Sequence, residues 1–399
     1  MQRQVGQPAA RGSGLLRPPT LCPAKSFVPM ALDDDTLRAY GLPPRPAADA
    51  SPRRHAMWKR LMSKRVSFVA PEFTVAEEDG TPPVDAQMHG ITSSSTRSRT
   101  WSGAVHTISN SDSDDSDNSD DSDDSDDSDD SDDSDYFTHI EASWTIPMVF
   151  PTPDKWDAET AAWSADPSEY TCGIWVGIDG WEKSHDILQA GTGMHCTVQD
   201  DGSLDHSFFA WFEWYPVPVH RLTNFRVHPG DVITVLVDFT GSASNSDTGS
   251  NYSGSGEGGG QNQSQSDIFT GQALYVNETN ATYTSFQYTY KCKNEDDRFK
   301  GNTAEWILER HRENKAAMPN FGASFVYNCC AVTEKGKERD LSGCTLMNMV
   351  EDPENDGSPE LSTPVQVSKD VLGLYWGDGT ISARHVEADS DSDSSDGAN

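Results

Sequence analysis

Glu305 lies in the stretch GNTAEWILER (301–310), directly before an apolar run. Two interpretations of this stretch are open. In the first, Thr303 caps a helix whose early turns favour acidic residues such as Glu305 and Glu309. In the second, the stretch is a strand that places Glu305, Ile307 and Glu309 on one face and buries the residues between them. On such a face, a carboxylate could do acid–base chemistry.

Other segments also carry polar and aromatic side chains on one face of a strand. These segments are CGIWVGIDG, DILQAG and SFFAWFEWYP. A sheet face lined with such side chains suits an extended polymer, either a peptide or a glycan. Ordinary roles are equally open for the polar members, as a sheet-edge amide or as solvated or hydrogen-bonded acids. The candidate residues are Trp175, Asp179, Gln189, Glu213 and Tyr215.

Several well-known hydrolytic motifs are missing from the sequence. There is no HExxH and no GxSxG, and DTG occurs only at 247–249, inside a Gly/Ser-rich segment. The 11 histidines show no triad-like context, and no cysteines form a CxxC pair. The sequence therefore gives little support to a serine, metallo- or aspartic peptidase or to a zinc ribbon. No metal or cofactor is expected.

Short strand-like runs are the elements that must position these residues. They are rich in Val, Ile, Thr and aromatic residues, are separated by Gly, Pro and Asp, and have no long helical pattern between them. This pattern is typical of an all-β fold, an antiparallel sandwich or barrel. The runs include TWSGAVHTI, THIEASWTIPMVF, CGIWVGI, SFFAWFEWY, VITVLVDF, QALYV, YTSFQYTYKC, FGASFVYNC and VLGLYW.

Composition divides the chain into parts with different roles. A Ser-Asp repeat separates TWSGAVHTI from THIEASWTIPMVF, and we interpret it as a disordered loop inserted in a hairpin. A Gly/Ser-rich loop separates VITVLVDF from QALYV. We predict a disordered or targeting segment (1–30), a basic segment with two short helical patterns and a linker (31–98), one β domain (99–378) with insertions at 109–135 and 241–267, and an acidic disordered tail (379–399).

The formal net charge of −34 is unevenly spread along the chain. Residues 1–100 hold 14 basic and 9 acidic residues, whereas residues 111–135 hold 15 Asp and no base. A protein this acidic would repel phosphates, so no nucleic-acid partner is expected. No apolar stretch of membrane-spanning length occurs, so no membrane partner is expected either, and we predict a monomer.

The cysteines and glycosylation sequons favour a secreted protein. Six of the seven cysteines lie after residue 170 and could form three disulfides, with the pairing open. Sequons occur at Asn251, Asn262, Asn277 and Asn280. The N-terminus, however, has no apolar segment of signal-peptide length. An intracellular location or a different true start, for example Met30, therefore stays open.

A set of short motifs resembles the glutamic peptidases, also called eqolisins, over about residues 99–378. The stretch before the β domain is similar to a segment found ahead of such domains. The most specific motifs are ILQAG (187–191) and AEWILE (304–309). The others are WSGAV (101–105), WVGIDG (175–180), AWFEWYP (210–216), PGD (229–231) and PNFG (319–322).

This resemblance implies a jelly-roll-like, concanavalin-like sandwich of two curved antiparallel sheets with a substrate groove on a concave face. It places Glu305 on a strand, which decides between the two interpretations above. It also implies a catalytic dyad of Glu305 and Gln189. The groove-lining positions implied by the family are Trp101, Trp175, Asp179, Glu213 and Tyr215.

The implied activity is acid-acting endopeptidase hydrolysis of polypeptides. A carboxylate can take a proton from water and return it to the leaving amine, while a glutamine can orient the water and bind the oxyanion. No metal or covalent intermediate is needed. A Glu base with a pKa of about 4–5 would suit acidic solution. We further hypothesise that the basic segment 31–98 acts as a propeptide that blocks the groove.

Two other functions compete with this one. The first is a non-catalytic sandwich that binds glycans or peptides on the same aromatic face. The second is an acidic interaction protein whose Ser-Asp run binds Ca²⁺ or basic partners, although a solvating loop is the simpler interpretation of that run.

Overall fold

The computed structural model describes residues 15–48, 51–75, 97–108, 135–181, 186–244, 267–292, 298–310 and 316–379. The predicted Ser-Asp insertion therefore lies almost entirely outside the described residues. The same is true of the middle of the Gly/Ser insertion, most of segment 76–98 and nearly all of the acidic tail.

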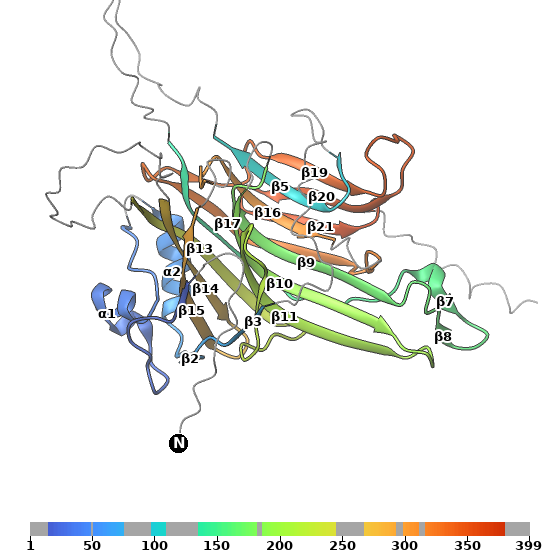
Figure 1. Ribbon diagram of the computed structural model, residues 1–399, viewed down its shortest axis with the longest axis horizontal. Helices are drawn as coiled ribbons and strands as arrows, with labels where there is room; N and C mark the ends of the chain where they lie inside the picture. Colours follow the sequence, from blue (N-terminus) through green and yellow to red (C-terminus); the bar gives the residue numbers. More distant parts are fainter. Residues whose placement is uncertain are drawn as a thin grey trace, which may run out of the picture.

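Two curved antiparallel sheets pack face to face, so the predicted all-β sandwich is confirmed (Figure 1). The first sheet has the order β3–β12–β11–β10–β9–β16–β5. Its strands are β3 (Phe73–Val75), β12 (His220–Leu222), β11 (Leu204–Tyr215), β10 (Ile187–Val198), β9 (Glu169–Ile178), β16 (Thr303–Glu309) and β5 (Trp101–Thr107).

The second sheet has the order β15–β14–β13–β6–β17–β21–β20. Its strands are β15 (Thr282–Lys291), β14 (Asp267–Asn277), β13 (Val232–Ser244), β6 (Phe137–Thr145), β17 (Ala323–Thr333), β21 (Val371–Trp376) and β20 (Glu360–Ser368).

Strand β19 (Thr345–Val350) joins the two sheets along one side. Its first half pairs with β5 and its last two residues pair with β20. Short elements complete the described chain: β1 (Leu15–Arg17), β2 (Ser67–Phe68), β4 (Arg97–Ser98), β7 (Trp156–Asp157), β8 (Ala162–Trp163), β18 (Glu338–Arg339), and the 3-10 helices η1 (Pro29–Ala31) and η3 (Pro153–Lys155).

Alternation of side chains along the strands determines which face of each sheet is buried in the sandwich. On β9, Ile174 and Val176 point between the sheets, as the pattern CGIWVGI predicts. On β16, Trp306 does the same, and its indole N–H donates to the Glu141 carbonyl of the opposite sheet. The remaining face of β16 therefore points out of the sandwich, and this face carries Glu305.

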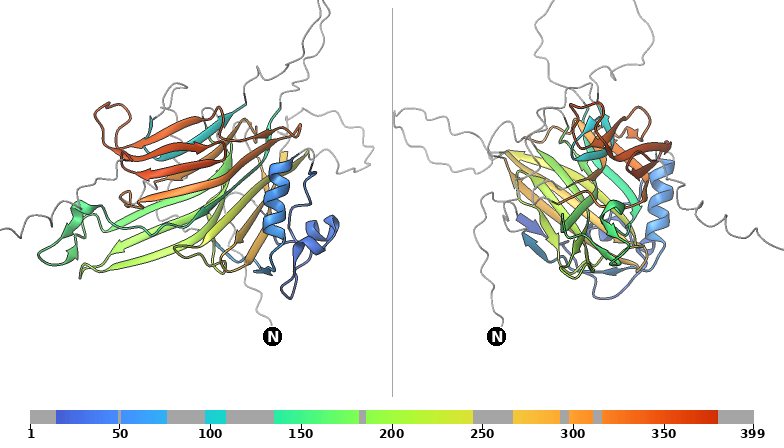
Figure 2. Two further views of the ribbon diagram at one scale, coloured as in Figure 1. Left: turned by 180° about the vertical axis from the view of Figure 1, so that it is seen from behind. Right: turned by 90° about the vertical axis from the view of Figure 1, so that its right-hand side faces the viewer.

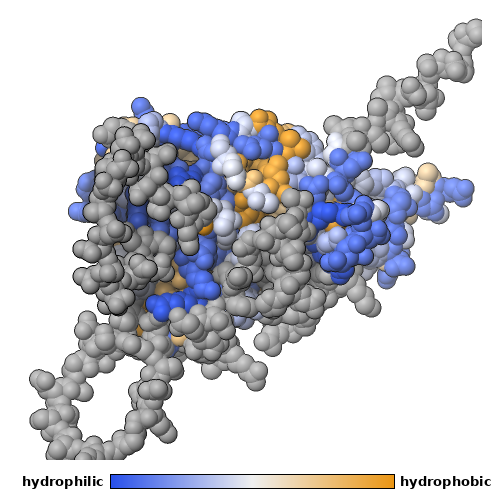
Figure 3. Space-filling view, turned by 90° about the horizontal axis from the view of Figure 1, so that it is seen from above, coloured by the Kyte–Doolittle hydropathy of each residue, from blue (hydrophilic) through white to orange (hydrophobic). Residues whose placement is uncertain are grey.

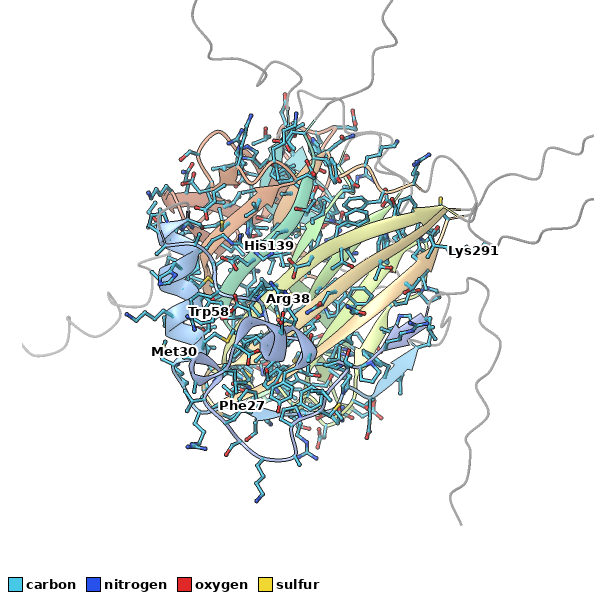
Figure 4. All side chains as sticks on the ribbon, turned by 90° about the vertical axis from the view of Figure 1, so that its left-hand side faces the viewer. Phe27, Met30, Arg38, Trp58, His139 and Lys291 are labelled. Atoms are coloured by element: carbon cyan, nitrogen blue, oxygen red, sulfur yellow. The ribbon has the colours of Figure 1, made fainter. Side chains whose placement is uncertain are left out.

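The N-terminal segment covers part of the outer face of the second sheet (Figures 1 and 2). It contains α1 (Asp34–Ala39), whose first turn is capped by Asp33, and α2 (Pro52–Met62). The apolar side of α2 packs against β13 and β14, where Leu236 and Leu274 point outward. Figure 4 shows this side of the molecule, with Trp58 of α2 and His139 of β6 labelled. Both helical patterns predicted from the sequence are thus confirmed.

One predicted connection is wrong. The strands on either side of the Ser-Asp run do not form a hairpin, because β5 pairs with β16 and β19 while β6 pairs with β13 and β17 in the other sheet. Alternation shows that both segments are strands, but it holds no information about their partners. By contrast, β13 and β14, on either side of the Gly/Ser-rich loop, do form a hairpin, and their pairing continues into that segment as far as Ser244 and Asp267.

The cysteines, sequons and surface differ in part from the sequence-based expectations. All seven cysteines lie within the described residues and none is in a disulfide, so the possible disulfides are not formed. Asn277 is buried, and its side-chain amide donates to Asp231 at 2.8 Å, so in the folded protein this sequon is not open to glycosylation. No helix among the described residues has the length and apolarity to cross a membrane. Seen from above, an apolar patch interrupts a largely hydrophilic surface (Figure 3).

Candidate active site

Gln189 and Glu305 lie in one transverse row on the outer face of the first sheet. The row runs from Glu213 on β11 to Gln189 on β10, Gly177 on β9 and Glu305 on β16, each residue being paired with the next. Because neighbouring strands are about 4.8 Å apart, the backbones of Gln189 and Glu305 are separated by roughly 10 Å. Gly177 between them has no side chain, and the atom nearest to where its Cβ would lie is Cζ3 of Trp175, also on β9, at 3.0 Å.

Glu213 fixes the orientation of the Gln189 side chain. The amide Nε2 of Gln189 donates to Glu213 Oε2 at 2.7 Å, and both side chains are buried. The amide oxygen of Gln189 has no hydrogen-bond partner among the described residues. With its nitrogen held by Glu213, the amide presents that oxygen elsewhere on the face.

Glu305 is fully buried, and neither of its carboxylate oxygens has a hydrogen-bond partner within the described part of the chain. Burial raises the pKa of Glu305 well above its ordinary value. The nearby Thr303 hydroxyl favours the ionised form in part, whereas the charges of Asp179 and Asp186 add to the rise in pKa. The carboxyl group thus keeps its proton to a higher pH than the 4–5 expected from the sequence.

Asp179 is held by backbone hydrogen bonds, and its role as a substrate contact, which the resemblance implies, stays a prediction. Its carboxylate accepts the backbone N–H groups of Lys300, Gly301 and Asn302 at 2.7–2.9 Å, and its own N–H donates to the Thr303 carbonyl. Asp179 therefore clasps the residues that lead into β16. Its backbone is in the left-handed region, at φ 67°. Burial raises the pKa of Asp179 although these three N–H groups oppose the rise.

Two tryptophans share one carboxylate beside the row. Trp101 on β5 and Trp175 on β9 meet edge to face, with ring centroids 4.9 Å apart. The indole of Trp101 donates to Glu309 Oε1 at 3.2 Å, and that of Trp175 donates to Glu309 Oε2 at 2.9 Å. Burial raises the pKa of Glu309 to about 7, although both indole N–H groups favour the ionised form.

The structure thus brings six of the seven predicted site residues to one sheet face: Trp101, Trp175, Gln189, Glu213, Tyr215 and Glu305. Tyr215 is half-buried at the end of β11, opposite Ile187. Glu309 and Trp211 have no predicted role, although both share the face of Glu305 and Glu213. The signal was available, because each lies two or four residues from a predicted site residue on the same strand.

The described part of the basic N-terminal segment is not on this face. Its helices contact the outer face of the second sheet, on the opposite side of the sandwich core. Within the described part of the segment, β3 pairs with β12 at the end of the first sheet, and β4 pairs with β19. Whether the segment inhibits stays a prediction, and its described residues carry none of the contacts to Gln189 or Glu305. In the described ranges, no group of three or more His, Cys, Asp or Glu could hold a metal ion.

Comparison with known proteins gives consistent matches. The Peptidase A4 family model matches residues 129–257 and 261–371, which include Gln189 and Glu305. The chain is 30% identical to Aspergillopepsin-2 of Aspergillus niger over 210 residues, which is 52% of this chain and 60% of that protein. It is 24% identical to Scytalidopepsin B of Scytalidium lignicola over 184 residues, which is 44% of this chain and 56% of that protein.

Similar solved structures include a scytalido-glutamic peptidase with a peptide-based transition-state analogue. It has a TM-score of 0.42 and 17% identity, and the match covers 70% of this chain and 98% of that chain. Aspergilloglutamic peptidase from Aspergillus niger has a TM-score of 0.36 and 26% identity, covering 52% of this chain and 99% of that one. The chain spans somewhat less than two thirds of the length of the two curated relatives. Because the family model matches more than half of the sequence, the chain belongs to the Peptidase A4 family.

Proposed function

We propose that this protein is an acid-acting endopeptidase in which Glu305 activates a water molecule and Gln189 assists. The observation that supports the proposal most directly is the transverse row. A carboxyl group and an amide stand on either side of Gly177, and both Glu305 oxygens and the Gln189 oxygen have no partner among the described residues. These are the atoms that must contact water and a peptide carbonyl during hydrolysis.

In the proposed reaction, ionised Glu305 takes a proton from water while the Gln189 oxygen orients that water. The hydroxide adds to the peptide carbonyl carbon, and the second N–H of the Gln189 amide donates to the oxyanion. Glu305 then gives the proton to the leaving nitrogen as the C–N bond breaks. Glu213 keeps the amide in the required orientation by accepting its other N–H.

The raised pKa of Glu305 has a consequence for the pH profile. The base must be ionised, so kcat/KM should rise with pH through the Glu305 pKa, which burial holds above the ordinary value. Activity on the acid side is thus limited by Glu305. On the alkaline side we expect it to be limited by stability, because buried carboxyl groups with raised pKa destabilise the fold as they ionise.

The decisive test is Glu305→Gln, assayed on a denatured protein substrate at acid pH. The change keeps the volume of the side chain and removes the base, so hydrolysis should fall by at least about 10²–10⁴-fold while the variant stays folded. EDTA and serine-directed reagents should leave the parent protein active. Near-parental hydrolysis by folded Glu305→Gln would overturn the mechanism.

A non-catalytic sandwich that binds glycans or peptides is the alternative, and it predicts a different result. No form of the protein would hydrolyse the substrate, and saturable binding would be indifferent to Glu305→Gln. The secreted location stays a prediction, to which the seven cysteines, none of them in a disulfide, add no support. Intact-mass analysis of the native protein would show its N-terminus and any glycans together.

A further inference from the structure

We propose that Glu309 is a positioning residue, which sets the place of Trp175 at the space between Gln189 and Glu305. This inference rests on the proposed function of that site. It assigns to Glu309 a role that neither the family match nor the dyad chemistry requires.

The first step is the pair of hydrogen bonds to Glu309. The side chain is buried, and each carboxylate oxygen accepts one indole N–H, from Trp175 at 2.9 Å and from Trp101 at 3.2 Å. A carboxyl group can accept on both oxygens, whereas no apolar side chain can accept either bond. A buried indole N–H that loses its acceptor is costly, so the two rings are tied to Glu309.

The second step is the direction of the Trp175 ring. Glu309 is paired with Gly173 on β9, whereas Glu305 is paired with Gly177, four residues further along. The N–H edge of the Trp175 ring points to Glu309. The opposite edge of the ring reaches Gly177, because a Cβ at Gly177 would lie 3.0 Å from Trp175 Cζ3. The indole therefore extends from the carboxylate of Glu309 to the residue between Gln189 and Glu305.

The consequence is that Trp175 forms one wall of the space where the peptide bond would react. A shift of the Glu309 end of the ring moves the other edge toward or away from Gly177. Small displacements of such a wall alter the alignment of substrate with water and base, and alignment strongly affects the rate of the chemical step. The effect should appear in kcat more than in KM.

The test is a double-mutant cycle with Glu309→Met and Trp175→Phe, measured as kcat and KM at acid pH on a peptide substrate. We expect each single variant to lower kcat about tenfold or more. If Glu309 acts through Trp175, adding Glu309→Met to Trp175→Phe should change kcat by less than about twofold. In a Trp101→Phe background, Glu309→Met should still lower kcat, because Trp175 remains.

Two further variants complete the design. Glu309→Gln keeps one acceptor oxygen for Trp175 and should recover kcat to within about threefold of the parent. Glu141→Met removes a buried carboxylate from the opposite sheet and should leave kcat per folded molecule unchanged. Should Glu309→Met fail to fold, Glu309→Asp, which withdraws the carboxylate by one methylene, takes its place in the cycle.

A merely structural role for Glu309 gives additive losses in the cycle, or losses that follow the folded fraction measured by near-ultraviolet circular dichroism. Either result overturns the inference, as does a Glu309→Met variant with parental kcat. These outcomes leave the proposed function standing if Glu305→Gln is inactive. Activity in Glu305→Gln would instead remove the proposed function itself.

Discussion

The outer faces of the two sheets both bury carboxylates, but they treat them in opposite ways. On the second sheet, Glu278 accepts hydrogen bonds from Arg60 and Lys64 of the N-terminal segment and from Thr234. Burial alone would raise the pKa of Glu278, but these bonds lower it below its ordinary value. On the first sheet, the pKa values of Glu305 and Glu309 are raised, because burial is not offset by a nearby cation.

The same contrast holds for the neighbouring charges of the second sheet. His139 lies between Asp238 and Glu141, at 2.6 and 3.2 Å, and Arg53 lies 3.6 Å from both Asp340 and Asp370. Burial and Arg54 would lower the pKa of His139, but the two carboxylates raise it. Burial of a carboxylate is therefore no sign of chemistry by itself. What distinguishes the candidate active site is burial without a compensating base.

The largest expected effect comes from adding one more carboxylate to the first sheet face. Gln189→Glu is nearly isosteric, but it places an acid beside Glu213 and across Gly177 from Glu305. The added charge should repel the oxyanion and raise the Glu305 pKa further, so hydrolysis at acid pH should fall by about 100-fold or more. Gln366→Glu, at an exposed position on β20, is the matched control and should be neutral. Equal activity of the two variants would show that an added carboxylate has the same effect on both sheets, against the difference between their outer faces described above.

A smaller effect is expected from removing the bases on the second sheet face. The double change Arg60→Met and Lys64→Met leaves Glu278, whose side chain is 5% exposed, without its cations. Because both bases are partly exposed, we expect a loss of about 1–3 kcal/mol in the free energy of unfolding. The midpoint of thermal unfolding would report it, with kcat per folded molecule unchanged.

Arg38→Met provides the control for that loss. Its ion pair with Asp35 is exposed on both sides, so the free energy of unfolding should change by less than about 0.5 kcal/mol. If both changes cost the same, the pairing of Glu278 contributes nothing beyond a surface contact.

The stabilities of the two faces should also depend on pH in opposite directions. Glu309 has a folded pKa of about 7 against roughly 4.3 when unfolded, so the folded state holds the extra proton between these values. Its contribution to stability is therefore present below about pH 4.3 and is lost as pH rises toward 7, by at most about 4 kcal/mol. Glu278, with its lowered pKa, stabilises above about pH 4.3 and loses this effect as pH falls further.

Hydrogen exchange can follow both faces in one experiment. After correction for intrinsic exchange rates, protection of β16 should decrease from about pH 4 to 7, whereas protection of α2 should decrease below about pH 4. Parallel changes in the two elements would show that the electrostatic contrast does not control local stability.

Much of the first sheet could be predicted from residue patterns because alternation is a local property. AEWILE and ILQAG each show which side chains share a face, and the structure confirms that assignment for Glu305, Ile307 and Glu309. The register that aligns Gln189, Gly177 and Glu305 is not local. It depends on β16, which lies more than 100 residues after β10, pairing with β9, so only the family resemblance could suggest that the two residues meet.

The wrong hairpin and the unforeseen hydrogen bonds of Asp179 have the same physical origin. The partners of the Asp179 carboxylate lie more than 120 residues further along the chain, so no pattern near Asp179 could show that it clasps the start of β16. The strands on either side of the Ser-Asp run seemed to form a hairpin because proximity in sequence favours pairing. Their actual partners are chosen by which sheet buries each apolar face.

The N-terminal segment also covers the terminal strands of both sheets, on the side of the sandwich opposite β19. Strands β1 and β2 pair with β15 at the end of the second sheet, and β3, only a few residues after β2, pairs with β12 at the end of the first. Unpaired backbone groups on such terminal strands would offer a template for another chain. A protein shortened before β4 would expose both margins at once, so its first failure would be self-association, and refolding of the isolated sandwich should depend steeply on its concentration.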